Sequence, residues 1–246
     1  MSFRVICVGK ELSGVYRSVI SLGLEGVSVQ TTTMFPEPTP TDENKMVILL
    51  ANEDSKLLRD IARSFYQAGV LTLIVSTHYL DNLKEVCDSM TVANMESMPL
   101  IVKTLIDLLI KQGSICFDVN DLSATLHNTH KFKTVSVISR NKENRILECV
   151  KSLGGILEAY KLSEPENISI ILYHNKDINP PLAMNELQPL SEFMGNFPED
   201  VTVKWGLSFD NEMPTDEIRL DAIAAGKTLN SIPPTDFAGG GMKYKY

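Results

Sequence analysis

The sequence lacks the features of a secreted, membrane-spanning or nucleic-acid-binding protein. Its four cysteines are far apart and include no C-x-x-C pair, which is typical of buried thiols in a reducing compartment. No apolar run approaches the ~18 residues of a membrane-spanning helix, and the N-terminus becomes strand-like too early for a signal peptide. The net charge of −8 argues against nucleic acid as the main partner. These absences predict a cytoplasmic protein with no integral membrane segment and no nucleic acid partner.

Common catalytic signatures are also missing. The sequence contains no G-x-S-x-G, H-E-x-x-H or Walker A pattern. His127 and His130 lie three residues apart in a predicted helix and could share a metal, but no cysteine or acid clearly completes the set. We therefore expect these histidines to be solvated or to cap a helix, and we predict no metal site. The lack of any convergent catalytic set makes an unrelated α/β enzyme the least favoured interpretation.

The N-terminal part alternates between apolar strands and amphipathic helices. Strands are predicted over 3–8, 46–51 and 70–75, and helices over 12–23 and 55–68. Strands that are apolar on both faces indicate a parallel sheet with helices on both sides, so the fold class is α/β. The other elements predicted here are a strand over 27–32 and a proline-rich loop over 35–40.

A helix predicted over 98–112 is apolar around most of its circumference. Its polar stripe consists of Lys103, Asp107 and Lys111, which are four residues apart. A helix of this kind must be buried on nearly all sides, and we expect it to be a central spine between two domains.

The C-terminal part is predicted to be an α+β domain with a mixed sheet. Residues 201–209 alternate between apolar and polar side chains, which predicts a strand with one face on a core, and 218–225 is the expected hairpin partner. The tail from Lys227 carries Pro233-Pro234, Gly239-Gly240-Gly241 and Lys243-Tyr244-Lys245-Tyr246, and we expect it to be mobile unless it docks. The other elements predicted here are helices over 118–128, 142–154 and 183–194 and strands over 132–139 and 168–173.

Four short segments occur in a defined order along the chain. They are Gly23-Leu24-Glu25-Gly26-Val27, Ile115-Cys116-Phe117-Asp118-Val119-Asn120-Asp121-Leu122, Glu143-Asn144-Arg145, and Asp216-Glu217-Ile218-Arg219-Leu220-Asp221-Ala222-Ile223-Ala224-Ala225-Gly226. With the order of elements, these segments resemble the tubulin/FtsZ superfamily, and its FtsZ branch in particular. The resemblance implies a truncated FtsZ-like N-terminal domain (1–96), a central helix with the synergy loop (97–117), an FtsZ-like C-terminal domain (118–226) and a flexible tail (227–246).

The resemblance also implies glycine-rich phosphate loops after the first strand and after strand 46–51. The matching positions hold Gly9, Lys10 and Glu11 in the first loop and Asn52, Glu53 and Asp54 in the second. Side chains fill the space that a phosphate needs, and two like charges ~4 Å apart repel by about 4 kcal/mol at an effective dielectric near 20. Lys10 offsets part of this charge. In the simpler interpretation of the second loop, Asp54 or Ser55 caps the following helix.

Asp118 and Asp121 match the two synergy-loop aspartates, which in the family reach into the nucleotide site of the next subunit. Cys116 stands where the family has asparagine. A structural alternative is that Asp118 caps a helix whose third residue, Asp121, interacts favourably with the helix dipole.

The leading hypothesis is a non-hydrolysing FtsZ/tubulin-like protein, a pseudo-GTPase that acts through protein–protein association. Its expected partners are further copies of itself or a conventional FtsZ, in a cytoskeletal or cell-division process, with no cofactor. The alternative is a divergent FtsZ-like GTPase that binds GTP or GDP and polymerises. Because the family's longitudinal contact would bring acids of both loops toward Asp118 and Asp121, we expect no long protofilaments of identical subunits.

Overall fold

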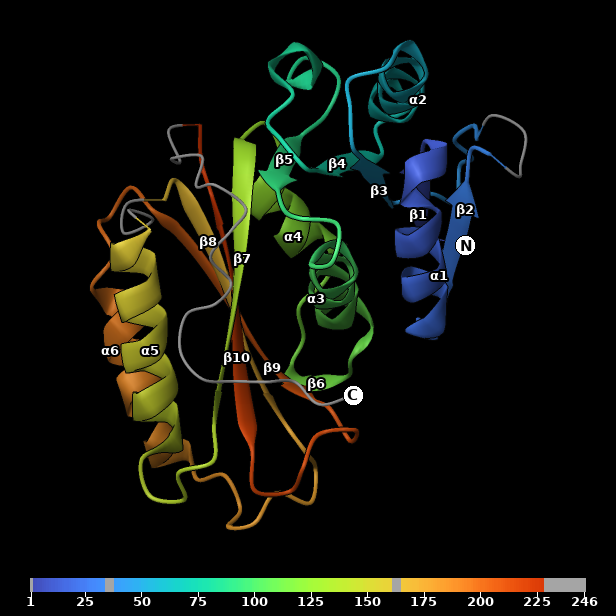
Figure 1. Ribbon diagram of the computed structural model, residues 1–246. Coiled ribbons are helices and arrows are strands. Elements are labelled where there is room, and N and C mark those ends of the chain that lie inside the picture. Colours follow the sequence, from blue (N-terminus) through green and yellow to red (C-terminus); the bar gives the residue numbers. More distant parts are fainter. Residues whose placement is uncertain (1, 34–37, 161–164, 228–246) are drawn as a thin grey trace.

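The computed structural model describes residues 2–33, 38–160 and 165–227. Ten strands in this part of the chain form one sheet, with helices on both faces (Figure 1). The predicted α/β class, with a parallel N-terminal half and a mixed C-terminal half, is confirmed. Residues 35–37 of the predicted proline-rich loop and the tail beyond Lys227 lie outside the described residues.

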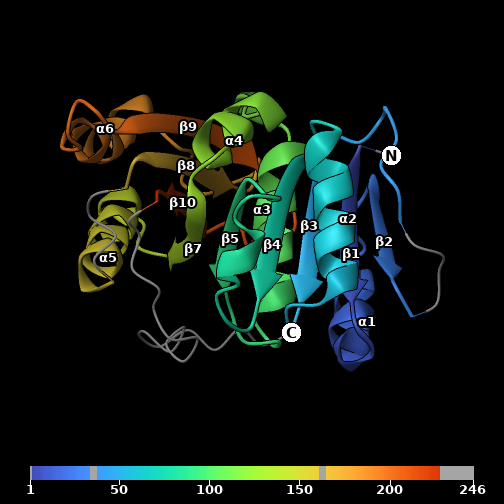
Figure 2. The ribbon, with the colours of Figure 1, turned by 90° about the horizontal axis from the view of Figure 1, so that it is seen from above.

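The N-terminal half is a parallel sheet of apolar strands. Every residue of two of its central strands is buried, because helices cover both faces (Figure 2). The short strand after the second 3-10 turn was not predicted. The elements are β1 (Phe3–Val8), η1 (Lys10–Leu12), α1 (Ser13–Ser21), β2 (Val27–Thr31), β3 (Met46–Ala51), α2 (Lys56–Gln67), β4 (Leu71–Ser76), η2 (Asp81–Leu83) and β5 (Ser89–Val92).

Helix α3 (Met98–Ile110) confirms the predicted spine. Its side chains Val102, Leu105 and Ile106 are fully buried in the core cluster that holds the inner faces of β1, β3 and β4. The same cluster includes residues from the C-terminal half of the sheet, such as Tyr173. The helix therefore contributes to one core that both halves share.

The C-terminal half has helices on both faces of a mixed sheet. In Figure 1, α5 and α6 lie on one face and α3 and α4 on the other. The long strand β7 pairs with β5 of the N-terminal half and with β10, which makes the sheet continuous. The elements are β6 (Gly113–Ile115), α4 (Val119–Leu126), β7 (His130–Ser139), α5 (Arg145–Ala159), β8 (Asn167–His174), η3 (Met184–Leu187), α6 (Gln188–Gly195), β9 (Thr202–Phe209) and β10 (Ile218–Ala225).

The strand order is β2-β1-β3-β4-β5-β7-β10-β8-β9-β6, and it corrects one prediction. The segment 218–225 is not the hairpin partner of 201–209. It forms β10, which lies between β7 and β8 and is antiparallel to both. β9 instead runs parallel to β8 and is only half-buried along much of its length, because its other neighbour is the short β6. Nearly all of β10 is buried, as a central strand requires.

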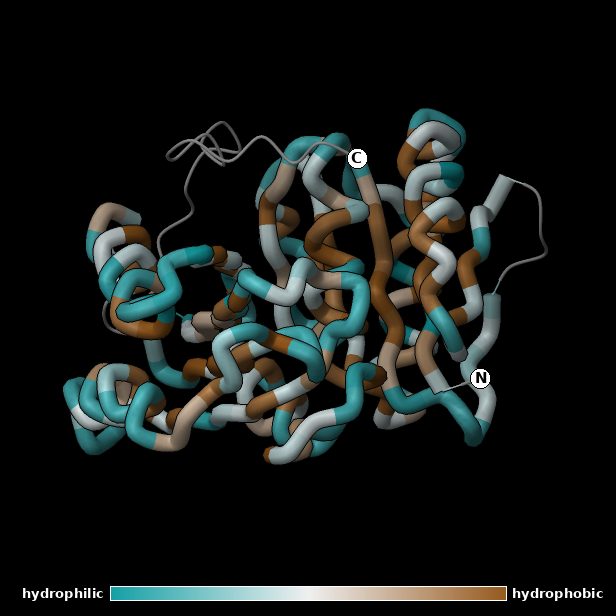
Figure 3. The backbone as a smooth tube through the Cα atoms, turned by 90° about the horizontal axis from the view of Figure 1, so that it is seen from below, coloured by the Kyte–Doolittle hydropathy of each residue, from teal (hydrophilic) through white to brown (hydrophobic). Residues whose placement is uncertain are grey.

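The apolar side chains form three clusters. One lies between α2 and the N-terminal strands, one lies between the helices α5 and α6 and the C-terminal strands, and the third is shared by both halves around α3. Figure 3 shows the hydrophobic segments gathered where strands and helices meet, with hydrophilic segments mainly in the outer loops. In the described part of the chain the longest helix, α5, has 15 residues, and no helix there is long and apolar enough to cross a membrane.

Candidate functional site

The two loops that match phosphate-loop positions leave the sheet side by side. Val8 at the end of β1 pairs with Ala51 at the end of β3, and Ala51 pairs with Ser76 at the end of β4. The loops that begin at Gly9 and Asn52 are therefore neighbours at the carboxyl edge of the parallel strands. Ligands of open α/β sheets bind at this edge.

The first loop turns immediately into helix. Gly9 has a φ of 109°, which favours glycine, and its N–H donates to Thr32 Oγ1 at 3.3 Å. A Cβ added at Gly9 would lie 2.1 Å from Glu11 Oε1, so the Glu11 carboxylate occupies the space over the Gly9 backbone. Leu12 is fully buried and anchors η1 against the sheet. The lack of a side chain at Gly9 therefore makes room for the Glu11 carboxylate of the same chain.

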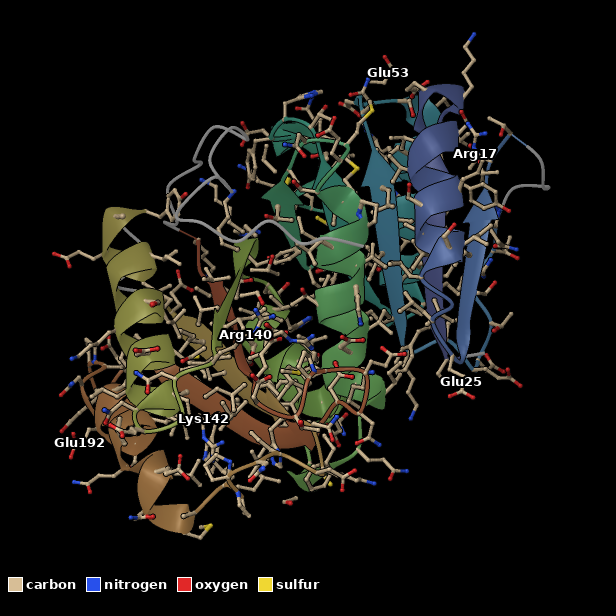
Figure 4. The ribbon with its side chains drawn as sticks, turned by 60° about the horizontal axis from the view of Figure 1, so that its bottom comes forward. Arg17, Glu25, Glu53, Arg140, Lys142 and Glu192 are labelled. Carbon is tan, nitrogen blue, oxygen red and sulfur yellow. The ribbon has the colours of Figure 1, made fainter. Side chains whose placement is uncertain are left out.

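The second loop is tied to its surroundings by hydrogen bonds from its side chains. Ser55 is the N-cap of α2 and accepts the Leu58 N–H at 3.1 Å, as the capping interpretation predicted for Asp54 or Ser55. Asn52 Oδ1 accepts from the Thr77 hydroxyl at 2.7 Å. Glu53 is exposed at the outer rim of this edge (Figure 4).

Asp54 has two partners of its own. Its carboxylate lies 2.8 Å from Arg59 and accepts from the Asn82 amide at 3.2 Å. Arg59 is already paired, and the edge presents the exposed carboxylates of Glu11 and Glu53 together with the exposed cations of Lys10 and Lys56. A polyphosphate placed here would meet carboxylates where a phosphate-binding loop offers backbone N–H groups.

The synergy-loop matches lie at the opposite end of α3. Asp118 is the N-cap of α4 and accepts the N–H groups of Asn120 at 2.7 Å and Asp121 at 3.1 Å. The Asp121 carboxylate accepts the Asp118 N–H in return, which completes a capping box. The N–H of Asp121, with that of Asn120 and the nearby Lys45, holds the pKa of Asp118 below its usual value.

Lys204 on β9 lies 3.3 Å from Asp121. The acidic charge at this end is therefore smaller than the sequence suggested, because Lys45 and Lys204 accompany Asp118 and Asp121. The structure does not bring these aspartates near the two loops within one chain, since they lie at the other edge of the parallel strands.

A buried ion network connects α3 to β10, and sequence reasoning missed it. The stripe Lys103, Asp107 and Lys111 faces the C-terminal sheet: Asp107 lies 3.1 Å from Arg219 and 2.6 Å from Lys103. Arg219 also lies 3.4 Å from Asp210, which in turn meets Lys111 at 2.9 Å. A polar stripe on a nearly all-apolar helix was the signal that partners of opposite charge must face it.

The electrostatics of this network follow from burial and from the match of opposite charges. Burial alone would lower the pKa of Arg219, but the carboxylates of Asp221, Asp107 and Asp210 outweigh it and raise that pKa. The Asp221 side chain is fully buried, which raises its pKa, and it accepts from the Ser136 hydroxyl at 2.6 Å. The network is thus a structural connection between α3 and the C-terminal sheet, and Lys111 at its end lines a cavity of about 220 Å³.

Arg145, from the Glu143-Asn144-Arg145 match, is another buried cation that the sequence left without a role. It is 1% exposed and pairs with Glu186 at 2.9 Å. It also donates to the carbonyls of Pro180 and Pro181 at 2.9 and 3.2 Å. Arg145 therefore fixes the loop between β8 and α6 against the start of α5.

The two histidines do not converge on a metal site. His127 pairs through Nδ1 with Asp88, which is buried and also accepts the Thr72 N–H at 2.7 Å. The described residues contain no group of three or more histidine, cysteine or acidic side chains placed to hold a metal ion. His127 instead joins the end of α4 to the N-terminal half.

Comparison with solved structures gives the fold a name. A variant of FtsZ from M. jannaschii superposes with a TM-score of 0.71, over 92% of this chain and 91% of that chain, at 16% identity. The chain has the tubulin/FtsZ fold. CetZ from Methanosaeta thermophila matches with a TM-score of 0.63 over 91% of this chain and 86% of that one, at 10% identity. TubZ of Bacillus thuringiensis serovar israelensis, solved as GDP-form protofilaments, matches with a TM-score of 0.60 over 92% and 85%, at 8% identity.

No protein-family model and no curated protein matches the sequence. The resemblance noted from four motifs is therefore confirmed by tertiary structure, and at these identities the comparison shows the fold alone. On the tubulin/FtsZ fold, the two loops at Gly9 and Asn52 occupy the carboxyl edge of the parallel sheet. The assignment of Asp118 and Asp121 to the synergy loop stays a prediction.

Proposed function

We propose that this chain is a cytoskeletal protein of the tubulin/FtsZ type that acts through protein–protein association and does not bind or hydrolyse GTP. The observation that carries the proposal is the first loop. The Gly9 N–H is used by Thr32, and the Glu11 carboxylate fills the space over Gly9. A phosphate group at this position would have to displace a carboxylate and break the contact to Thr32.

The second loop supports the same conclusion. A four-residue connection from Asn52 to Ser55 leads straight into α2, and three of its four side chains hydrogen-bond to neighbouring segments of the chain. Rebuilding it around a phosphate would cost the helix cap, which contributes about 0.5–2 kcal/mol. The alternative, a divergent GTPase, requires both loops to rearrange on binding.

Isothermal titration calorimetry with GTP and GDP at near-millimolar concentration tests the proposal. We expect no saturable heat from this chain, with the GDP-form TubZ as the positive control for GDP. A dissociation constant in the micromolar range would contradict the proposal and favour the GTPase. A Glu11→Gly variant sharpens the test, because the second loop alone should still prevent binding.

Association is the activity that the proposal assigns to this chain. TubZ was solved as protofilaments, which supports self-association of this fold, and a conventional FtsZ is the other expected partner. Sedimentation velocity should give the same assembly state with and without GTP. Electron microscopy should show no long protofilaments, because the carboxylates of Glu11 and Glu53 at one end of a subunit would face Asp118 and Asp121 of the next subunit. Straight protofilaments would show that this charge does not decide the assembly.

A pull-down with FtsZ and GTP separates the two partners. If the aspartates at α4 reach a partner, replacing Asp118 and Asp121 by alanine should reduce FtsZ capture at least tenfold. Glu192→Ala on α6 is the matched control, since Glu192 is exposed and far from α4 (Figure 4). Equal capture by the double variant and the wild type would leave these aspartates as helix caps only.

A further inference from the structure

The two sides of strand β7 are paired to different extents. On one side, β10 pairs with it from Phe132 to Ser139. On the other side, β5 has only four residues, and its pairing with the ten-residue β7 ends at Met90 and Lys131. Figure 1 shows β7 running on past the end of β5. In the part of the chain that the structure describes, residues 134–139 therefore have no strand on this side, and we call them the β7 edge.

The backbone groups of β7 alternate between β10 and the open side. The Gly226 N–H donates to the Lys131 carbonyl at 3.0 Å, and the His130 N–H donates to the Asp88 carbonyl, beside β5, at 3.1 Å. Odd-numbered residues of β7 thus point their backbone groups toward β10, and even-numbered residues point theirs the other way. Along the β7 edge, the outward groups are those of Thr134, Ser136 and Ile138.

These outward N–H and C=O groups have no hydrogen-bond partner among the described residues. Thr134 is buried, and Ser136 and Ile138 are half-buried. Unpaired backbone groups are unfavourable away from water, and an open strand edge is a template for a further strand. Helices α5 and α3 do not supply the partner, because they lie on the two faces of the sheet and not in its plane (Figure 1). The sheet is therefore able to accept one more strand at this edge.

The spacing of the outward groups selects the kind of occupant. Backbone groups of alternate residues on a strand lie about 6.8 Å apart, so those from Thr134 to Ile138 span about 14 Å. A helix or a small molecule does not present donors and acceptors at this repeat. An extended chain of about five residues meets all of them with its own backbone. The occupant is therefore an extended polypeptide segment.

Charge adds a requirement at one end of the β7 edge. The Lys133 ammonium donates to the Val92 carbonyl at the end of β5 at 3.3 Å, so this side chain reaches toward the open side. Burial lowers the pKa of Lys133, and no carboxylate in the described structure offsets that effect. Glu148, an acid on the same face of the strand, instead accepts from the Ser139 hydroxyl at the other end of the edge. A carboxylate supplied next to Lys133 would give this half-buried cation a partner of opposite charge.

We propose that the β7 edge binds an extended segment of a different protein, which adds a strand beside residues 134–138 and places a carboxylate next to Lys133. This surface is separate from the two loops at the carboxyl edge of the parallel strands and from the α4 cap, so it goes beyond the association proposed above. On the α5 face, the added strand lies beside Val135 and Val137, which belong to the apolar cluster under α5. Apolar β-branched residues of the partner suit these positions.

Hydrogen exchange on the full-length chain without a partner is the first test. We expect the amides of Thr134, Ser136 and Ile138 to exchange at least tenfold faster than those of Val135 and Val137, which are bonded to β10. Slow exchange at all five positions in a dilute sample would overturn the proposal, because another part of the same chain would already pair with the edge. Protection that appears as the protein concentration rises would overturn it too, since the occupant would then be a second copy.

A phage-displayed library of random heptapeptides, panned against the full-length chain without nucleotide, supplies the probe. We expect enriched peptides in which β-branched residues alternate with polar ones and an acid lies near one end. A synthetic copy of such a peptide should protect the amides of Thr134, Ser136 and Ile138 from exchange. N-methylation of its alternate backbone nitrogens should lower its affinity at least tenfold, because the methyl groups remove the donors that pair with the edge.

Two variants of the chain locate the binding. Ile138→Pro removes an outward N–H and leaves the bonds to β10 intact, so it should weaken peptide binding at least tenfold, whereas Ile138→Val keeps that N–H and is the matched control. Lys133→Glu should weaken binding severalfold, with Lys142→Glu, an exposed cation beyond the end of β7, as its control.

The proposal would be overturned if no peptide is enriched, or if the N-methylated peptide binds as well as its parent. Equal binding by Ile138→Pro and Ile138→Val would overturn it in the same way, and thermal melts show whether both are folded. The N-methylated peptide needs no change in the protein, so the test does not depend on the stability of a variant. No nucleotide is present, so a failure here is distinct from a failure of the calorimetry with GTP.

Discussion

Helix α3 contacts the two halves of the protein through different chemistry. Toward the N-terminal sheet it presents aliphatic side chains such as Leu105, which pack into the shared core. Toward β10 it adds the buried ion pairs of Asp107 and Lys111 with Arg219 and Asp210. Aliphatic contacts are non-directional and tolerate small shifts, whereas a buried ion pair is favourable only with its partners in place. The charges therefore fix the position of α3 against the C-terminal sheet more strictly than the aliphatic side chains fix it against the N-terminal one.

Removing the central cation should have the largest effect. Arg219→Met leaves the carboxylates of Asp107, Asp210 and Asp221 buried without their shared partner. Breaking a buried ion pair in this way costs about 3–5 kcal/mol, which urea unfolding would measure. Arg63→Met is the control, because Arg63 and its partner Asp60 are both exposed, and it should change stability by no more than about 0.5 kcal/mol. If the two variants lost the same unfolding free energy, the buried ion pairs would not fix α3 against the C-terminal sheet more strictly than its aliphatic contacts fix it against the N-terminal sheet.

A substitution that creates a cavity on the aliphatic face of α3 should lower the stability by a comparable or slightly smaller amount. Leu105→Ala removes a fully buried side chain and should cost about 2–5 kcal/mol, depending on how far the neighbours collapse into the space. Thermal melts would show this as a lower midpoint. Leu57→Ala on α2 is the control, since Leu57 is 37% exposed, and its midpoint should move much less. A shift of only a degree or so for Leu105→Ala would mean that α3 is not the shared core.

The smallest effect is expected at the α4 cap, where charge is exposed. Asp118→Asn keeps an N-cap side chain, so it should cost less than the ~1 kcal/mol typical of losing a cap. The folded pKa of Asp118 is lowered, so its contribution is complete above the unfolded value of about 3.9 and is lost as pH falls through the folded value. Unfolding free energies from pH 5 to pH 2 should converge for wild type and variant. A difference that persists at pH 2 would contradict the capping role of the ionised carboxylate.

Most elements of the N-terminal half, although not the short strand β5, could be predicted because local pattern and global position agree there. Strands β1, β3 and β4 are buried on both faces, so each reads as a continuous apolar run of strand length. The spine helix was equally clear from its apolar circumference. Of the candidate site, the helix-capping alternatives at Ser55 and Asp118 could be predicted, since caps depend only on neighbouring residues.

The placement of β10 and the partners of Arg219 could not be predicted in this way. A strand's neighbours depend on contacts between distant segments, and the adjacency of 201–209 and 218–225 in sequence favoured a hairpin that does not form. The sequence shows that α3 carries a polar stripe, but not which cation faces Asp107. The position of the Glu11 carboxylate over Gly9 likewise follows from the conformation of the turn and not from the residue types.

The central position of β10 determines when the protein can finish folding. β10 is the last strand described, yet it separates β7 from β8, both of which are synthesised much earlier. During translation the N-terminal half has all of its strands before the C-terminal sheet is complete, because domains fold as the chain emerges. A chain interrupted before Ile218 would expose two open strand edges, to which other chains can pair. Emergence of β10 from the ribosome is therefore the step that closes both edges.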